Sequence, residues 1–179
     1  MKIISTGQSL KDLKVQYGIG ANGFYLQNWY NNEAFFTDKP EVGEYEVLIE
    51  KKALTNLTYD EQVKKLEKNW VTPHPAILMQ ALLEYHKKTG KYAMKNWHSR
   101  TSLRDSDGSR VYVGYCDADG VYVFSVWVGY RDDNVGLSAS RKFKKSIDTG
   151  SLESFESSPL ELRVSVLEEK LRKIGEAIK

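Results

Sequence analysis

Two histidines and three acidic turns carry the side chains of this chain that could do chemistry. His74 lies between Pro73 and Pro75, where a stiff backbone could hold its ring as a general base or a metal ligand, and His98 lies beside Trp97. Histidine suits both roles because its charge changes near neutral pH. The acidic turns are Asp-Ser-Asp-Gly at 105–108, Asp-Ala-Asp-Gly at 117–120 and Arg-Asp-Asp-Asn at 131–134. One hypothesis is therefore a hydrolase or another enzyme that uses His74 or His98 with these turns.

No complete catalytic signature accompanies these residues in the sequence. The three histidines do not stand at a recognised ligand spacing, and no glycine-framed elbow surrounds Ser99 or Ser102. Cys116 is the only cysteine, which excludes an intrachain disulfide and a two-cysteine redox or zinc site and favours a reducing compartment. The sequence therefore favours structural roles for the histidines, and it predicts no catalytic residue and no cofactor.

The acidic turns are more typical of chain reversal than of metal binding. A calcium loop of the EF-hand type needs oxygen ligands at alternating positions and a closing glutamate, and neither 105–108 nor 117–120 continues in that way. Aspartate and glycine are favoured in turns for reasons of backbone geometry alone. We predict no metal site, with calcium held between Asp132, Asp133, Asn134 and a second acidic loop as the open alternative.

A nucleotide-binding fingerprint has to be weighed at Gly18, Gly20 and Gly23. These glycines match Gly-x-Gly-x-x-Gly, but that fingerprint requires a hydrophobic strand before it and a helix after it. Residues 12–16 are too charged for that strand. The match therefore predicts a loop.

Composition predicts one domain with an appendage. A chain of 179 residues that is 41% hydrophobic can bury one sizeable core. A net charge of +2 gives no reason to expect a nucleic acid as partner, although Arg141, Lys142, Lys144 and Lys145 form a local basic cluster. The N-terminus lacks the apolar region of a secretory signal, and no segment reaches the roughly 20 apolar residues of a membrane span. We expect no membrane association and a cytoplasmic or virion-associated protein.

Hydrophobic periodicity predicts the elements that position these residues. Tyr45, Val47 and Ile49 alternate with polar residues as in a half-buried strand. Thr58-Tyr59-Asp60-Glu61 fits a capping box that starts a short helix. A second helix is predicted from the prolines at 73 and 75 to Thr89-Gly90, with apolar residues at helical spacing.

The segment from Asn96 to Phe143 is rich in strands. Alternation places Val111, Val113 and Tyr115 on one face of a strand over 110–116, and Val121, Val123 and Trp127 on one face of a strand over 121–128. The four residues between the two strands predict a hairpin. The fold class expected is α+β, with helices before an antiparallel, strand-rich segment.

A series of short segments occurs in the order found in a known fold. The segments are Val-Thr-Pro at 71–73, the helix over 77–85, Asn-Trp-His-Ser-Arg-Thr-Ser at 96–102, the strand over 110–115, Asp-Gly-Val at 119–121 and Asn-Val-Gly-Leu-Ser-Ala-Ser-Arg at 134–141. Over residues 40–143 the chain thus resembles the C-type-lectin-like fold, in the bacterial branch related to formylglycine-generating enzymes and to the variable proteins of diversity-generating retroelements. In its closing strand, Leu137 and Ser138 replace the usual Phe-Arg.

The resemblance implies a binding function without catalysis. Formylglycine-generating activity uses a pair of cysteines, which this chain lacks, and the lectin sugar motifs Glu-Pro-Asn or Gln-Pro-Asp followed by Trp-Asn-Asp do not occur. The version that remains displays a ligand-binding surface just before the closing strand. That surface would consist of Tyr112, Tyr115, Asp117, Tyr122, Phe124, Trp127, Tyr130, Arg131, Asp132, Asp133 and Asn134.

The residue types of this surface favour contact with a protein or another macromolecule. Tyrosine and tryptophan provide large contact area at small entropic cost, and aspartate, asparagine and arginine provide polar contacts that can be oriented. The alternative is that some aromatics belong to the core, because alternate strand positions face inward.

A C-terminal helix completes the predicted domain organisation of a ligand-binding domain over 1–143, a serine-rich linker over 144–158 and an amphipathic helix over 159–179. Leu160, Val164, Leu167, Leu171, Ile174 and Ile178 follow one another at spacings of four and three. Such a seam can dock on its own domain or mediate self-association, so an assembly protein is a further hypothesis.

Overall fold

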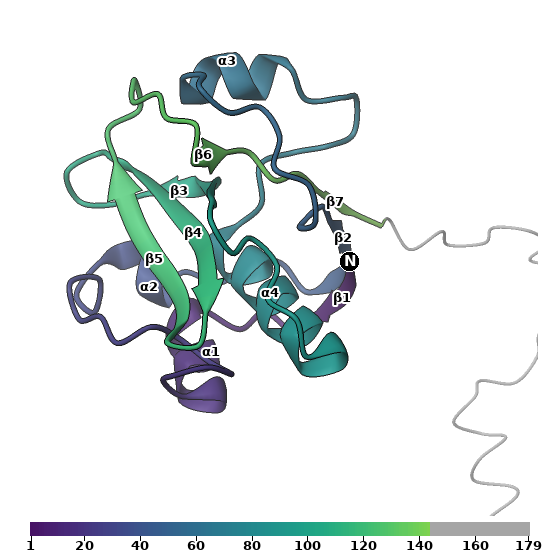
Figure 1. Ribbon diagram of the computed structural model, residues 1–179, viewed down its shortest axis with the longest axis vertical. Coiled ribbons are helices and arrows are strands. Elements are labelled where there is room, and N and C mark those ends of the chain that lie inside the picture. The colour runs from purple at the N-terminus through teal and green to yellow at the C-terminus, as the bar shows by residue number, and fades with distance from the viewer. Residues whose placement is uncertain (144–179) are drawn as a thin grey trace, which may run out of the picture. The chain divides into compact units, whose positions relative to one another are not determined.

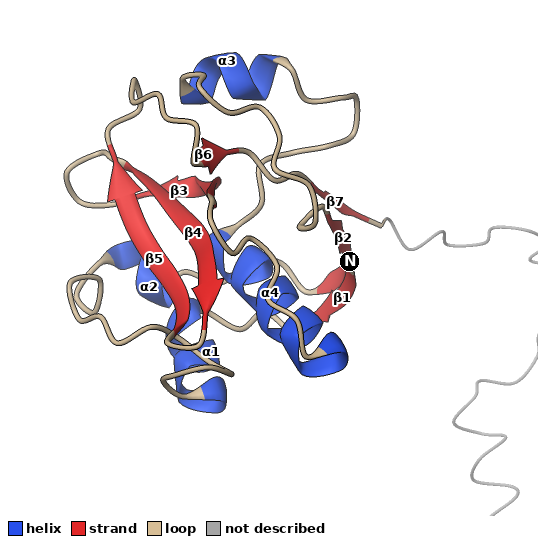
Figure 2. Cartoon of the chain, in the orientation of Figure 1, coloured by secondary structure: helices blue, strands red, loops and turns tan. Residues whose placement is uncertain are grey.

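Two sheets organise residues 1–143, which are the part of the chain that the computed structural model describes (Figure 1). The three-stranded sheet has the antiparallel order β1 (Lys2–Ser5), β2 (Gly43–Val47), β7 (Ser140–Lys142). The four-stranded sheet has the order β5 (Gly120–Val126), β4 (Arg110–Asp117), β3 (His98–Arg104), β6 (Val135–Gly136), with β6 parallel to β3. The helices are α1 (Leu10–Tyr17), α2 (Ala34–Thr37), α3 (Tyr59–Lys64) and α4 (Pro75–Thr89) (Figure 2). The predicted α+β class is confirmed.

Helix α4 is the central element of the core and has the predicted ends. Pro75 occupies its first position, and Gly90 terminates it in the left-handed conformation at φ 67°. The helix contacts β1 of the smaller sheet and β3, β4 and β5 of the larger one. Its residues from Pro75 to Leu83 are all buried. Burial on all sides explains why this stretch is hydrophobic around most of its circumference.

The capping box at the start of α3 forms as the sequence predicts. The Thr58 hydroxyl accepts from the Glu61 backbone N–H at 3.3 Å, and the Glu61 carboxylate accepts from the Thr58 N–H at 2.7 Å. Helix α3 ends at Lys64, before Leu66 and Trp70. The predicted strand around Tyr45 is confirmed as β2, which ends at buried Val47, so that Ile49 of the predicted pattern is buried but lies beyond the strand.

The predicted hairpin of β4 and β5 is confirmed, but a bulge changes one of its faces. Val111 and Val113 on β4 and Val121 and Val123 on β5 are buried, as the alternation predicts. The register shifts between Gly114 and Asp117, where Tyr115 has a positive φ of 51°. The prediction that Tyr115 shares a face with Val113 is therefore wrong. Cys116 is buried in its place, and Tyr115 is 41% exposed.

The loop over residues 23–29 covers the outer edge of β5. The Tyr25 N–H donates to the Val121 carbonyl at 3.0 Å, and the Val121 N–H donates to the Gly23 carbonyl at 3.0 Å. Farther along, the Trp29 indole N–H donates to the Val123 carbonyl at 3.1 Å. Pairing of this kind removes the exposed strand edge that would otherwise attract other chains.

Helix α1 and strand β1 are elements that the sequence did not reveal. The glycines at 18, 20 and 23 follow α1 and form a loop, which agrees with the loop prediction. A Cβ atom at Gly23 would lie 2.3 Å from the Gly18 carbonyl oxygen, so close backbone approach explains this glycine. Within residues 1–143, no helix is long and apolar enough to cross a membrane. The predicted linker and C-terminal helix lie outside the described residues.

Candidate functional site

Six ring-bearing side chains form a continuous cluster on the four-stranded sheet, which we call the aromatic face. Its members are Tyr25, His98, Tyr112, Tyr115, Tyr122 and Phe124. Tyr25 stacks on Tyr122 with ring centroids 3.8 Å apart, and Tyr122 stacks on Phe124 at 5.8 Å. None of the six is fully buried. Rings in contact that remain partly accessible form a preassembled apolar surface with polar edges.

The strands explain why these rings lie on one side. Tyr112 on β4 pairs with Phe124 on β5, and Gly114 pairs with Tyr122. Their neighbours Val111, Val113, Val121 and Val123 are buried in the core. Because successive strand residues point to opposite faces, the rings occupy the side away from the core. The bulge brings Tyr115 to the same side, where its ring lies 5.7 Å from that of Tyr122.

His98 lies at the centre of the aromatic face. Its imidazole stacks on Tyr115 at 5.3 Å and meets Tyr112 and Phe124 edge-on at 5.1 and 5.4 Å. Burial lowers the pKa of His98 to about 4, which the nearby Asp132 carboxylate only partly opposes. The ring is therefore neutral at pH 7 and no carboxylate of residues 1–143 lies within hydrogen-bond distance of it. This arrangement suits packing and contact better than proton transfer.

Strand β4 can approach the backbone of His98 closely because it carries a glycine at the paired position. Gly114 is paired with His98 and has a φ of 151°. A Cβ atom at this position would lie 2.6 Å from the Trp97 carbonyl oxygen and 2.9 Å from the His98 Cα atom. Close approach of the two backbones therefore requires glycine at position 114.

The loop between β5 and β6 forms one border of the aromatic face. The Tyr130 hydroxyl donates to the Asp132 carboxylate at 3.1 Å, and the other Asp132 oxygen accepts from the Asn134 N–H at 2.6 Å. Lys52 donates to the Asn134 side chain at 3.3 Å. Asp132 thereby forms the turn that its residue type predicts, while its carboxylate remains beside the rings.

Buried Arg100 anchors this loop through its side chain. Its guanidinium donates to the Leu57 carbonyl at 3.2 Å, to the Gln62 amide oxygen at 2.7 Å and to the Tyr130 carbonyl. Both Arg100 and Gln62 are fully buried. Burial lowers the pKa of Arg100, and its charge is balanced by carbonyl dipoles, since no carboxylate is bonded to it within the described chain.

The structure brings together seven of the residues predicted for the ligand-binding surface. Tyr115 and Tyr122 lie in the aromatic face, and Tyr122 continues it to Tyr25. An open hollow of about 290 Å³ at the loop end is lined by Val135 and by His98, Tyr112, Tyr115, Phe124, Tyr130, Asp132 and Asn134. The predicted surface thus acquires a concave part.

The other four predicted residues have different surroundings. Trp127 lies beyond the end of β5 at Val126 and is 62% exposed, so the prediction that it shares a strand face with Val121 and Val123 is wrong. Its ring packs over Gly129. Arg131 is paired with Glu61 at 2.8 Å. Asp117 accepts from the Asp119 N–H at 2.8 Å in the hairpin turn, and Asp133 is exposed. None of these four lines the hollow.

The acidic turns behave as turn formers. Asp105 accepts from the N–H groups of Asp107 and Ser109 at 3.1 and 2.8 Å, which parallels the bonds made by Asp117 and Asp132. These side-chain bonds to the following backbone explain the aspartates by local geometry. Among residues 1–143, no three His, Cys, Asp or Glu side chains gather as a metal-binding group.

His74, the other histidine of the enzyme hypothesis, caps a helix. Its Nδ1 accepts from the Ala76 N–H at 3.1 Å at the start of α4, and its Nε2 lies 3.1 Å from the Asp38 carboxylate. With Nδ1 as acceptor, the ring proton is on Nε2 and donates to Asp38. Burial lowers the pKa of His74, while Asp38 opposes that effect. Both ring nitrogens are thus engaged, and the acidic turns take no part.

We expect His74→Ala to lower the free energy of unfolding by about 1 kcal/mol, because α4 loses its side-chain cap. His74→Asn restores a side-chain oxygen that can accept from the Ala76 N–H and should recover most of this loss. Urea unfolding of the three proteins measures the difference. Equal stability of the alanine variant and the original chain would contradict the capping role.

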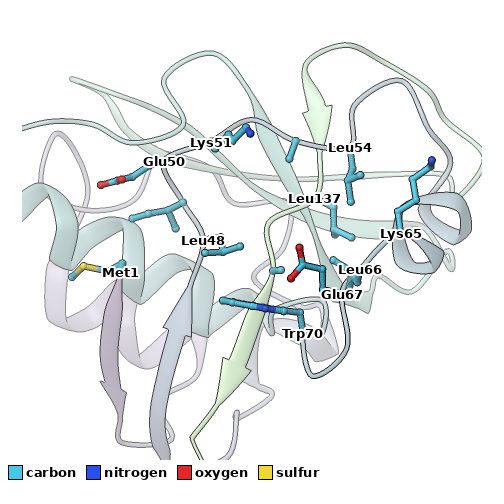
Figure 3. Close-up of a pocket in the computed structure, with 13 residues that line it drawn as sticks. Met1, Leu48, Glu50, Lys51, Leu54, Lys65, Leu66, Glu67, Trp70 and Leu137 are labelled. Atoms are coloured by element: carbon cyan, nitrogen blue, oxygen red, sulfur yellow. The ribbon is translucent and has the colours of Figure 1, made fainter.

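A second hollow, of about 520 Å³, lies away from the aromatic face (Figure 3). Figure 3 shows Met1 and Lys65 on opposite sides of it, with Leu48, Trp70 and Leu137 between them. Its described lining residues include no histidine, cysteine, serine or threonine. The hollow offers mainly apolar packing surface, and the charged residues that line it are Glu50, Lys51, Lys65 and Glu67. Cys116, at 2% exposure and with its pKa raised by burial, is also unsuited to nucleophilic attack.

Comparison with known proteins gives no family for this chain. No protein-family model, curated protein or solved structure matches it. The candidate site is therefore defined by the geometry of residues 1–143.

Sequence reasoning missed three residues of the site. Tyr25 reaches the aromatic face through backbone bonds to β5, and no sequence signal marks that pairing. His98 was weighed as a catalytic or a structural residue but was not assigned to the ligand-binding surface, although its place directly after buried Trp97, at the start of β3, could have marked it as an outward ring. The alternation of β3 places Arg100 on the same face as His98, which could have marked it as part of the site. Arginine is rarely buried without a carboxylate partner, so its residue type argued against this buried position.

Proposed function

We propose that residues 1–143 are a non-enzymatic binding module, with the aromatic face and the adjoining hollow as its contact surface for a protein or another macromolecule. The observation that carries the proposal is the continuous contact among six outward rings next to a carboxylate. Rings already held by one another lose little side-chain freedom on binding. Tyrosines and a carboxylate at its rim also give the orientable polar groups that specific interfaces use.

We further propose that the module has the C-type-lectin-like fold and is a variable protein of the retroelement type. The segment 134–141, which the resemblance assigns to a single closing strand, instead contributes two short strands to different sheets, β6 and the start of β7. Leu137 and Ser138, which depart from the usual motif, are both buried. The Ser138 N–H donates to the Ser99 hydroxyl at 2.6 Å, and its own hydroxyl donates to the Leu48 carbonyl. Ser138 thus links β3 to the residue that follows β2. A link between the two sheets supports the proposal that this segment closes the domain.

The binding function is tested by a crosslinking residue placed on the aromatic face. A photoreactive phenylalanine analogue at Tyr115 should capture a specific macromolecule from the native source, and the same analogue at exposed Val15 on α1 should not. Adding Tyr122→Ser and Phe124→Ser should reduce capture at Tyr115 at least tenfold. The matched change, Val15→Ser with Val71→Ser, removes two exposed side chains elsewhere and should leave capture unchanged. Equal capture at Tyr115 with and without the Tyr122→Ser and Phe124→Ser changes would overturn the proposal.

The retroelement part is tested by natural variation. Close relatives of the chain should differ mainly at Tyr112, Tyr115, Tyr122, Phe124 and 127–134, with Val111, Val113, Val121 and Val123 constant. Uniform residues at the outward positions would overturn this part and leave the binding function in place.

A further inference from the structure

The hollow at the end of the aromatic face combines ring surfaces with a carboxylate. Tyr112, Tyr115 and Phe124 contribute rings, and Asp132 contributes the charge. The volume of about 290 Å³ is open to solvent and suits a single large side chain better than a whole cofactor. Aromatic rings present negative charge on their faces and attract cations within about 6 Å.

The carboxylate of Asp132 keeps capacity for a further partner. It accepts from Tyr130 at 3.1 Å and from Asn134 at 2.6 Å. A carboxylate offers about four acceptor sites, so roughly two are left after these bonds. Asp133, exposed and next in the chain, adds negative charge at the same border.

The positive groups nearest to the hollow are occupied by protein partners. Arg131 is paired with Glu61 at 2.8 Å, and Lys52 donates to Asn134 at 3.3 Å. Arg100 is fully buried, and its guanidinium donates to two backbone carbonyls and to Gln62. His98 adds no charge at pH 7, because its pKa is lowered to about 4 by burial. Asp132 is therefore the only charged side chain among the described residues that line the hollow, although Lys52 keeps its positive charge beside Asn134.

We propose that this hollow binds the guanidinium of an arginine on a partner protein, with Asp132 as counter-ion and the rings of Tyr112, Tyr115 and Phe124 as cation–π acceptors. The inference rests on the binding function proposed above and names the chemistry of its ligand. A guanidinium is favoured over an ammonium because it is planar, weakly hydrated and able to stack on rings while it donates to a carboxylate.

The test uses a charged probe and its neutral isostere. N-acetyl-arginine amide and N-acetyl-citrulline amide have almost the same shape, but only the first is a cation. Both are titrated into the full chain at low ionic strength, and the NMR signals of the aromatic side chains and of the Asp132 and Asn134 amides are followed. We expect the arginine probe to shift these signals saturably and to bind at least tenfold more tightly than the citrulline probe. Added salt should weaken its binding.

Two matched variants locate the charge effect. Asp132→Asn removes the charge and keeps an oxygen that can accept from the Asn134 N–H, so the turn is retained. It should weaken binding of the arginine probe at least fivefold. Asp133→Asn changes the net charge equally at a residue that does not line the hollow, and it should change the affinity less than twofold.

Several outcomes would overturn the inference. These are equal affinity for both probes, unchanged affinity after Asp132→Asn, and no shift with the arginine probe up to about 50 mM. A parallel titration with methyl glucoside addresses the other ligand that stacks on rings, and saturable binding of the sugar alone would assign the hollow to carbohydrate. In each of these cases the crosslinking experiment at Tyr115 still decides the binding function independently.

Discussion

Replacing Arg100 with leucine is expected to lower the free energy of unfolding by about 3 kcal/mol. Leucine fills part of the space but leaves the Leu57 and Tyr130 carbonyls and the Gln62 amide oxygen without their donor. Each unsatisfied buried polar group costs about 1–3 kcal/mol of stability. Water that enters the vacated space can bond to some of the three oxygens, so the total loss is smaller than the sum of their separate costs. Urea unfolding followed by circular dichroism measures the change.

The same strand provides the control for Arg100. Arg104 is exposed and donates to the Gly108 carbonyl at 2.6 Å. Arg104→Leu should therefore change stability by less than about 0.5 kcal/mol. Hydrogen exchange adds a local measurement, because the β5–β6 loop loses its anchor at Tyr130 and its amides should exchange faster in Arg100→Leu. Equal stability of the two leucine variants would contradict the anchoring role of Arg100.

Acidification is expected to destabilise the protein through His98. Its pKa is about 4 in the folded state and about 6.5 when unfolded, so the unfolded chain binds the additional proton between these values. Stability therefore falls as pH falls through this window and is fully present above it. The linkage relation gives a loss of about 2 kcal/mol between pH 7 and pH 4.5.

Unfolding curves of the His98→Phe variant test this assignment. Phenylalanine keeps an aromatic ring beside Tyr112 and Tyr115 but cannot take up a proton. The variant should lose most of the slope of stability against pH between pH 7 and pH 4.5, whatever its stability at pH 7. His74→Asn serves as control, because the lowered pKa of His74 contributes in the same direction but more weakly. If the slope is as steep in His98→Phe as in the original chain, His98 is not its source.

The elements that the sequence predicts correctly are those whose signals are local. The Thr58–Glu61 capping box, the proline start and glycine end of α4, and the Asp-Ala-Asp-Gly hairpin each depend on residues within one turn of the chain. Their physical causes, which are hydrogen bonds to free helix ends and the backbone preferences of proline and glycine, act over the same short range.

The features that the sequence did not reveal depend on distant partners. Tyr25 joins the aromatic face through bonds to Val121, and Arg100 is held by carbonyls at residues 57 and 130. The bulge at Gly114 and Tyr115 is set by the approach of β3, which simple alternation does not include. Strand β1 has only four residues and is stabilised by pairing with β2, about forty positions later in the sequence.

The alternation of β4 and β5 also separates the residues of the core from those of the proposed contact surface. Val111, Val113, Val121 and Val123 pack into the core, whereas Tyr112, Tyr122 and Phe124 point away from it. Substitutions at partly exposed positions cost far less stability than substitutions at buried ones. Under the proposed binding function, exchange of the outward rings would therefore change the contact surface at little cost to the stability of the fold.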